Sequence, residues 1–450
     1  MLDLVTFKEH LTGLVEHSTN PVSFSQSNNN ATTQISSIRF IVAYSGGLDS
    51  HVLLHLMHAS QFNCRAVYVD HGLQAASIDW ADHCAAVCDQ LNMPFQSVSV
   101  NARAGKGESP EASARTARYQ ALSDLMQDGD ILLTAQHLQD QSETLLLQML
   151  RTSGPAGLAA MPVSKKFAAG MHIRPLLSTD RTDLEAYAHH HQLTWVEDPS
   201  NTDQRYDRNF FRQAVFPLLK KRWPSINQTL SNVSCLQAEA NELMNDLAAI
   251  DAEKTIDGNT LTISVLLKLS ATRQRNLVRY WLQQCQLDAP TAKRLKEILG
   301  SMITAADDKM PVVDWSNTEV RRFQGKLYAM KTMQSFSANQ QLEWNGQQAL
   351  VLPDLNKAVF FENITSDRLA EMTFSIRFRQ GGEKIKPSGR AYTMDLKKLM
   401  QQAAIPPWER SRLPLLYLDD KLVAVADYWM TEDFENLVNQ PSLLLKTRNL

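Results

Sequence analysis

Apolar and polar positions follow two alternating periods over residues 38–151. The run IRFIVAY, residues 38–44, is almost entirely apolar and rich in β-branched and aromatic residues, which is typical of a buried strand. From Leu48 the apolar residues fall on one face at helical spacing. Because similar runs follow in alternation, the pattern predicts an α/β domain with a doubly wound parallel sheet and helices on both faces. The other expected strands are 65–70, 95–100 and 130–135, and the other expected helices are 75–91, 110–127 and 140–151.

The remaining segments predict an additional helix before this domain and more domains after it. Residues 1–17 have the pattern of an amphipathic helix, and the polar run 18–34 has the composition of a connector. A long connecting helix is expected over 224–247, followed by a small helical region and then extended segments. We therefore expect three domains: a catalytic domain over 1–223, a mainly helical domain over 224–332, and an α+β C-terminal domain over 346–450.

Composition limits where the protein works and what it binds. The formal net charge is −3, from 45 Lys and Arg against 48 Asp and Glu, so any surface for nucleic acid must be local. Five cysteines without a disulfide framework indicate a reducing compartment. We expect a cytoplasmic protein, because the sequence has neither a basic-then-apolar leader nor eighteen consecutive apolar residues.

The turn between the first strand and its helix reads SGGLDS, residues 45–50. Two adjacent glycines allow a sharp turn and leave backbone N–H groups of the loop and helix start directed outward, which makes an anion site. The loop fits neither GxxxxGK[ST] nor GxGxxG. The expected backbone and hydroxyl donors to phosphate are Ser45, Gly46, Gly47, Leu48 and Ser50.

Further polar side chains follow two other strands at the same edge of the expected sheet. Asp70 and His71 end the second strand, where a nucleotide contact and a capped turn ending at Gly72 are both possible. After the last strand, His137, Asp140 and Glu143 stand at i, i+3 and i+6, a spacing that can direct all three towards one side of a helix start. Carboxylates in that position can hold Mg²⁺ and accept a proton.

Several blocks of the chain resemble those of a known family. SGGLDS fits the SGGxDS loop of the PP-loop pyrophosphatase superfamily (adenine nucleotide alpha hydrolase-like fold), whose members cleave ATP to AMP and pyrophosphate. Residues 377–425 resemble the C-terminal domain of the tRNA(Ile)-lysidine synthetase family, so the resemblance spans nearly the whole chain. Its successive motifs are similar to YVDHGLQAAS (68–77), EASARTARYQAL (111–122), HLQDQSETLLLQMLRTSGPAGLAAM (137–161), IRPLL (173–177) and WVEDPSNTDQRYDRNFFRQAVFPLL (195–219).

The resemblance implies a reaction on RNA. The family uses ATP to attach AMP to the ring carbonyl oxygen of the wobble cytidine in the isoleucine tRNA with a CAU anticodon, and free L-lysine then displaces AMP. The product, lysidine, changes the tRNA from methionine to isoleucine identity. The implied cofactors are ATP and Mg²⁺, the implied partners are this tRNA and L-lysine, and a homodimer is possible.

The resemblance also suggests residue roles. Arg115 is expected at phosphate, and Asp49 at Mg²⁺ or the lysine ammonium, because a carboxylate among phosphates needs a cation between them. A plain helix N-terminal acid is the alternative for Asp49. Catalytic roles fall on Asp49, Asp140, His137 and Glu143, with Asp49 and Asp140 as metal ligands. The family commonly has two adjacent acids where this chain has Gln139 before Asp140, so the catalytic weight is placed on Asp140.

Two basic segments are expected to contact tRNA. Arginines interleaved with aromatic residues in DPSNTDQRYDRNFFRQ suit a flipped-out anticodon base, although a charged helix face over the core is the alternative. Between Arg377 and Arg412 basic residues outnumber acidic ones, which indicates an RNA-facing surface. The expected tRNA contacts are Arg205, Arg208, Asn209, Arg212, Arg379, Lys384, Lys386 and Arg390.

Three other functions compete with this interpretation. A tRNA thiolase with the same loop would need reactive cysteines, and Cys64, Cys84 and Cys88 form no obvious catalytic pair. A synthetase acting on a small acceptor would leave the basic tail unexplained. A catalytically inactive tRNA-binding protein would be expected to lose loop residues, whereas Ser45, Asp49 and Asp140 are present.

Overall fold

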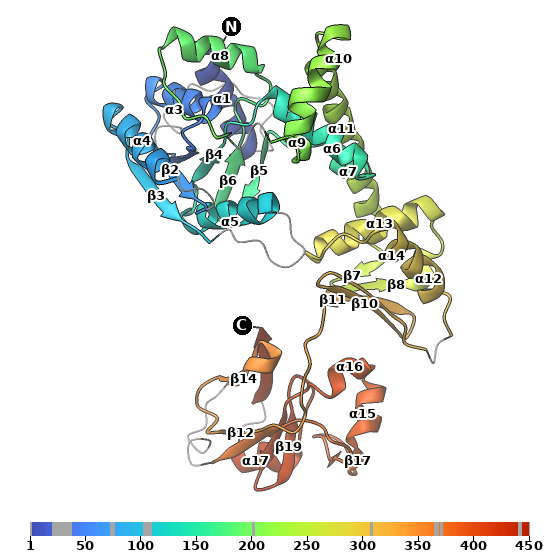
Figure 1. The fold of residues 1–450 in the computed structure, drawn as a ribbon. Helices are drawn as coiled ribbons and strands as arrows, with labels where there is room; N and C mark the ends of the chain where they lie inside the picture. The colour runs from blue at the N-terminus through green and yellow to red at the C-terminus, as the bar shows by residue number, and fades with distance from the viewer. Residues whose placement is uncertain are drawn as a thin grey trace. The chain divides into compact units, whose positions relative to one another are not determined.

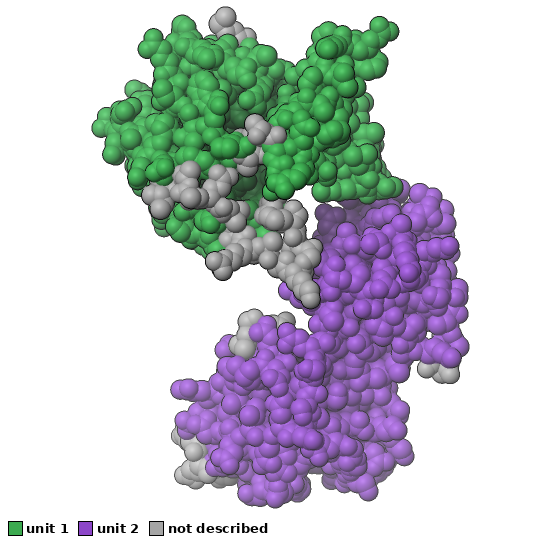
Figure 2. Space-filling model, viewed as in Figure 1, with its two compact units in different colours: residues 1–244 green, residues 245–450 purple. Residues whose placement is uncertain are grey.

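The computed structural model describes residues 2–19, 38–72, 77–101, 110–199, 203–306, 309–363, 369, 372–439 and 443–449. Most of the expected connector 18–34 lies outside these residues. The chain divides into two compact units, residues 1–244 and 245–450, coloured green and purple in Figure 2. Among the described residues, no helix has both the length and the apolar character needed to cross a membrane.

The first unit is built on a six-stranded sheet in the order β3-β2-β1-β4-β6-β5, in which only β5 is antiparallel to its neighbour (Figure 1). Residues alternate along β1: Phe40 and Val42 enter one core, and Ile41 enters the core on the opposite face. The predicted doubly wound parallel sheet is therefore confirmed. The strands are β1 Phe40–Ala43, β2 Cys64–Asp70, β3 Phe95–Ser99, β4 Ile131–Leu133, β5 Ser164–Phe167 and β6 Gly170–Ile173.

Helices cover both faces of this sheet and bury apolar residues in the cores on its two sides. Phe7, Leu53, Cys84 and Leu184, from four different helices, share the core with Phe40, whereas Leu122 packs on the opposite face with Ile41. The helices are α1 Leu4–Thr19, α3 Leu48–Ala59, α4 Ser77–Gln90, α5 Pro110–Asp124, α6 Leu138–Leu150, α7 Pro155–Leu158, α8 Arg181–His190, α9 Asp207–Phe210, the π-helical turn η2 Phe211–Val215, α10 Phe216–Arg222 and α11 Ile226–Ala252.

The first part of the second unit packs helices against a five-stranded antiparallel sheet, β7-β8-β11-β10-β9. Trp281 is fully buried between them, together with Leu277 and Val320. The extended segments expected before residue 331 thus form a complete sheet. The elements are β7 Ile256–Asp257, β8 Thr260–Thr262, α12 Ile263–Leu266, α13 Ala271–Gln284, α14 Ala292–Glu297, η3 Ile298–Met302, β9 Val312–Trp315, β10 Thr318–Phe323 and β11 Lys326–Lys331.

The rest of the second unit is α+β, as predicted. A five-stranded sheet, β12-β15-β18-β19-β20, shares a core with the three-stranded sheet β13-β14-β21 through residues such as Phe374, Phe361 and Leu445. The elements are β12 Gln341–Trp344, β13 Leu350–Leu352, η4 Pro353–Leu355, β14 Lys357–Glu362, β15 Phe374–Arg377, β16 Lys384–Ile385, β17 Met394–Asp395, α15 Leu396–Gln402, α16 Pro407–Arg410, β18 Leu415–Leu418, β19 Lys421–Val425, β20 Trp429–Met430, α17 Glu432–Val438 and β21 Leu444–Asn449.

Candidate active site

The SGGLDS loop turns sharply at Gly46, whose φ is +78°. Its carbonyl oxygen accepts a hydrogen bond from Val196 N at 2.9 Å, and a Cβ there would lie 3.0 Å from Cys84 Sγ. Gly47 precedes α3 in extended conformation, and no side chain caps the helix. The first N–H groups of α3 therefore have no capping side chain and can bind an anion.

Two serine hydroxyls close the loop from within. Ser50 Oγ donates to Gly47 O at 2.9 Å and accepts from Ser45 N at 3.2 Å. Ser45 Oγ lies 3.1 Å from Ser50 Oγ. Ser50 is buried. Its hydroxyl, expected as a donor to phosphate, is thus engaged in holding the loop, so the backbone is the main source of donors.

Three groups expected to act together converge beside the loop. His137 Nε2 lies 3.6 Å from Asp49 Oδ2 and 3.6 Å from Asp140 Oδ2. His137 is fully buried, and its Nδ1 accepts a hydrogen bond from Gln139 N at 3.2 Å. A neutral imidazole therefore has its proton on Nε2, directed at the two carboxylates.

The Asp49 carboxylate has an unusual environment. Burial raises the pKa of Asp49, the electrostatic effect of nearby His137 lowers it, and Asp140 raises it further. Its Oδ1 is buried and accepts no hydrogen bond, although 33% of the side chain remains exposed. A buried carboxylate oxygen without a donor is suited to bind a cation.

Glu143 is fully buried and forms an ion pair with Arg212. Arg212 donates to Glu143 Oε1 at 2.8 Å and Oε2 at 3.0 Å, and also to Asp140 Oδ1 at 3.0 Å. Burial lowers the pKa of Arg212, but the hydrogen bond and charge of Glu143 and the charges of Asp140 and Asp49 offset this, and the pKa is raised overall. The guanidinium that was expected at tRNA thus holds two carboxylates of α6.

The nucleotide contacts expected elsewhere at the sheet edge are only partly brought together. Asp70 Oδ1 accepts from Gly72 N at 2.8 Å, which is the capped turn considered as the alternative. His71 Nδ1 is buried without a hydrogen bond, and burial lowers the pKa of this histidine. Arg115 packs on the Tyr119 ring at 5.2 Å, and its charge acts on His172, whose pKa falls to about 3 mainly through burial.

The first basic segment lies against α6. Arg208 Nη2 donates to Thr144 Oγ1 at 3.3 Å, and Asn209 Nδ2 donates to Asp203 O at 2.9 Å. Arg205 is 87% exposed and paired with Asp203. This segment is therefore next to the carboxylates, with Arg205 at the surface.

The basic residues of the second unit lie at its surface or in weak pairs. Arg379 Nε is 3.7 Å from Glu383, and Lys386 Nζ is 4.0 Å from Glu432. Lys384 is exposed on β16, and exposed Arg390 donates to Gln402 Oε1 at 3.4 Å. The Lys386–Glu432 pair is about half exposed and costs little to break, whereas Arg379 and Glu383 are largely buried. Lys384, Lys386 and Arg390 therefore remain able to contact phosphates.

Two residues near the carboxylates were not anticipated. Lys220 Nζ lies 3.3 Å from Gln139 Oε1, and the charge of Arg181 lowers the pKa of Asp49. Lys220 directly follows the motif that ends at residue 219, so extending that motif by one residue would have found it. Arg181 offers no such signal, because it only begins α8.

The chemistry of the candidate site fits a nucleotide-activating enzyme. A parallel α/β sheet whose first strand ends in SGGLDS, with buried carboxylates beside the loop, defines a PP-loop ATP-binding protein, and the PP-loop domain family matches residues 21–219. The TilS substrate binding domain matches residues 261–328, and the TilS substrate C-terminal domain matches 374–446.

Curated relatives make the assignment more specific. The tRNA(Ile)-lysidine synthase of Coxiella burnetii is 41% identical over 412 residues, 90% of this chain and 92% of the relative. That of Methylococcus capsulatus is 40% identical over 405 residues, 87% and 92% of the two chains. The chain belongs to the tRNA(Ile)-lysidine synthase family and is an enzyme.

Solved structures give a weaker likeness. The U34-tRNA thiolase NcsA from Methanococcus maripaludis, with its [4Fe-4S] cluster, is 16% identical and covers 52% of this chain and 80% of its own. The TM-score is 0.41, which is too low to support a conclusion about this chain.

Replacing Gly46 by alanine should distort the loop. The new Cβ would meet Cys84 Sγ at 3.0 Å, and φ would remain +78°. We expect Gly46→Ala to lower the free energy of unfolding, measured by urea titration of the full chain, by about 1–3 kcal/mol. Gly47→Ala is the matched control: its φ is −76° and its nearest neighbour is 3.7 Å away, so it should change stability by less than about 0.5 kcal/mol. Equal losses in both variants would contradict this account.

Removing the Arg212 guanidinium should leave Glu143 buried without a counter-charge. We expect Arg212→Gln to destabilise the protein by about 3–5 kcal/mol in urea unfolding. Arg212→Gln combined with Glu143→Gln should recover most of that loss, because no buried charge then remains unpaired. Additive losses in the double variant would show that the two side chains do not act as a pair.

Proposed function

We propose that this enzyme ligates L-lysine to the wobble cytidine of tRNA(Ile) with a CAU anticodon. The reaction consumes ATP, passes through an adenylated cytidine, and yields lysidine, AMP and pyrophosphate. The main observation that supports this proposal is a sequence identity of about 40% to tRNA(Ile)-lysidine synthases over about nine-tenths of both chains. The paired carboxylates beside an uncapped PP-loop helix support it.

In the first step, the cytidine carbonyl oxygen attacks the α-phosphate and pyrophosphate leaves with added negative charge. The uncapped N–H groups at the start of α3 stabilise that charge without rearranging, because Ser45 and Ser50 already fix the loop. Because Gly46 has no Cβ, the backbone can turn close to Cys84. We assign Ser45 to Ser50 to the binding of the ATP phosphates, with His71 Nδ1 and Arg115 as further contacts.

Mg²⁺ fits the two carboxylates beside the loop. The described residues contain no group of three or more His, Cys, Asp or Glu placed to hold a metal, but Mg²⁺ usually takes only one or two carboxylates together with substrate phosphates and water. Asp49 Oδ1, which accepts no hydrogen bond, and Asp140 would hold it. When bound, the ion would neutralise charge on the phosphates.

In the second step, the ε-amine of lysine must lose a proton before it attacks. Asp49 and Asp140 together can bind the ammonium, and Asp49, whose pKa is raised mainly by burial, can accept that proton. His137 holds Nε2 between them, and Glu143 acts through Arg212, which fixes Asp140. We therefore assign positioning roles to His137 and Glu143.

We assign tRNA contacts to both basic segments. Arg205, Arg208 and Asn209 lie on the segment beside α6 and would bind the anticodon loop. Arg212, on the same segment, is assigned to the same contact. Arg379, Lys384, Lys386 and Arg390 would bind phosphates elsewhere on the RNA. The division into domains 1–223, 224–332 and 346–450, the possible homodimer and the cytoplasmic location stay predictions.

The thiolase alternative is disfavoured by the three cysteines that were considered for it. Cys84 and Cys88 are fully buried, and burial raises the pKa of each thiol to about 12. Cys64 behaves in the same way, with a pKa of about 11. Thiols that stay protonated at neutral pH are poor nucleophiles and cannot easily form a persulfide.

Labelled lysine should be transferred to a tRNA(Ile) transcript with a CAU anticodon in the presence of ATP and Mg²⁺. An elongator tRNA(Met) transcript, which shares the anticodon, should take up none. Asp49→Asn should reduce transfer by at least about 100-fold, because a carboxylate that acts in both steps is lost. Release of AMP and pyrophosphate without lysine transfer would contradict the proposed acceptor while retaining the PP-loop chemistry.

The same substitution should stabilise the nucleotide-free protein. The pKa of Asp49 is higher in the folded state than in the unfolded chain, mainly through burial, so the folded state keeps its proton to higher pH. Stability from this group is present at low pH and is lost as pH rises through the folded-state pKa. We expect Asp49→Asn to raise the thermal unfolding midpoint at pH 7 and to have no such effect at pH 3. A lower midpoint at pH 7 would exclude a strained carboxylate.

A further inference from the structure

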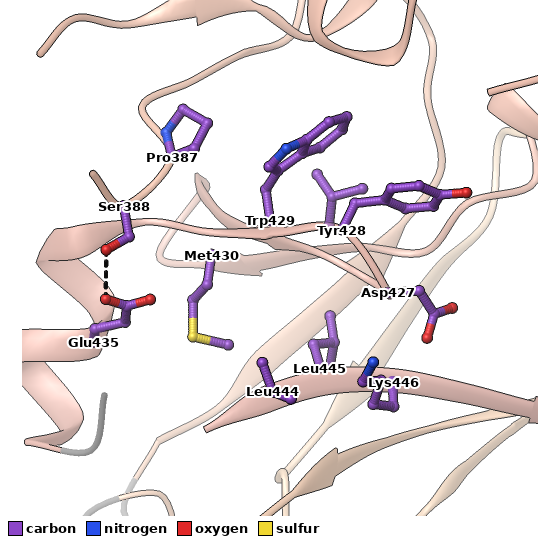
Figure 3. A pocket seen from close by; sticks show the side chains of 11 residues that line it. Pro387, Ser388, Asp427, Tyr428, Trp429, Met430, Glu435, Leu444, Leu445 and Lys446 are labelled. Carbon is purple, nitrogen blue, oxygen red and sulfur yellow. Dashed lines mark hydrogen bonds between the residues drawn. The ribbon is translucent and has the colours of Figure 1, made fainter. Parts of the chain in front are cut away.

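A small cavity lies between two sheets in the α+β part of the second unit (Figure 3). It has a volume of about 220 Å³ and is bounded by β20 on one side and β21 on the other. This is less than the roughly 300–1,000 Å³ of a site for a drug-sized molecule. The cavity therefore has room for a single ring system.

Two aromatic rings and several apolar residues are among the side chains that line it. Tyr428 and Trp429 lie side by side, with ring centroids 5.4 Å apart and planes tilted by 37°. Tyr428 is 41% exposed and Trp429 is partly buried, whereas Met430 and Leu445 are buried. The side chains of Trp429 and Met430 leave β20 on opposite sides (Figure 3). The accessible part of this pair of rings is suited to stack a planar ligand.

Polar groups stand at two sides of the cavity. On one side, Ser388 Oγ donates to Glu435 Oε2 at 2.7 Å (Figure 3). On another side lie Lys446, which comes from β21, and the carboxylate of Asp427, which accepts a hydrogen bond from Thr447 N at 2.9 Å. A carboxylate accepts hydrogen bonds from the edge of a base, and an ammonium pairs with phosphate.

The wall at Pro387 and Ser388 is continuous with basic residues. Lys384 and Lys386 precede it, Arg390 follows it, and Pro387 pairs with Thr431 next to β20. A phosphate chain that follows these cations would pass the mouth of the cavity.

We propose that this cavity binds one unpaired nucleobase of the tRNA, stacked on Trp429 and Tyr428, with its edge at Glu435. The assignment rests on the proposed tRNA substrate and adds a recognition site in the second unit. Because the carboxylate accepts hydrogen bonds, bases with an exocyclic amino group are preferred over uracil.

The first test measures the Kd of the full-length protein for the tRNA(Ile) transcript. Trp429→Ala should weaken binding about 10-fold, within the range for loss of one stacked base. Trp429→Phe, which keeps a ring, should stay within about 3-fold of the wild type. Thermal unfolding of each variant checks that the fold is kept, and Lys446→Ala gives a second variant that leaves the rings intact and should also weaken binding.

The second test uses hexacytidylate and hexauridylate as single-stranded RNA probes. The wild type should prefer the cytidine probe, and both Trp429→Ala and Glu435→Gln should reduce that preference. Folded variants whose transcript affinity and base preference match the wild type would overturn the proposal. Absence of lysine transfer by the wild type would instead contradict the proposed function, so the two failures are distinguishable.

Discussion

The buried ion pair between Glu143 and Arg212 is the contact on which the candidate active site depends. The side chain of Glu143 is fully buried, and the guanidinium donates to both of its oxygens. The same guanidinium fixes Asp140 Oδ1. Arg212, from the π-helical turn η2, therefore holds Asp140 together with His137 N, which donates to Asp140 Oδ2 at 3.1 Å. The same guanidinium ties the first basic segment to α6.

The fold could be predicted well from the sequence. Buried parallel strands give continuous apolar runs, and the loop with two adjacent glycines is recognisable from a few neighbouring residues. The sequence predicted less about which groups meet, since helical spacing identifies a face but no partner. Arg212 was expected at tRNA, yet its partner Glu143 lies 69 residues away. Ser50 and Asp70 show the same limit: each was expected at the nucleotide, and each has a hydrogen bond within its own turn.

Electrostatic balance around the loop explains how two carboxylates remain close together. Asp49 and Asp140 repel one another, and burial makes the charge on Asp49 more costly. His137 Nε2 lies between them, and the charges of Arg181 and Arg212 act on Asp49 from further away. The compensation is incomplete, because the pKa of Asp49 is still raised. On the proposed assignment, a bound cation would complete the compensation of the Asp49 charge. Cation binding would thereby relieve the repulsion between Asp49 and Asp140.

The balance of charges beside the loop also explains why position 139 carries an amide and not a carboxylate. The amide of Gln139 donates to Glu143 Oε1 at 3.1 Å and accepts from Lys220 Nζ at 3.3 Å. A carboxylate at this buried position could accept from Lys220, but it could not donate to Glu143 and would add a third negative charge beside Asp140. The amide thus links the buried acid to the lysine, and Arg212 has only two carboxylates to neutralise. The departure from two adjacent acids is therefore compatible with an active site in which Asp49 and Asp140 form the pair.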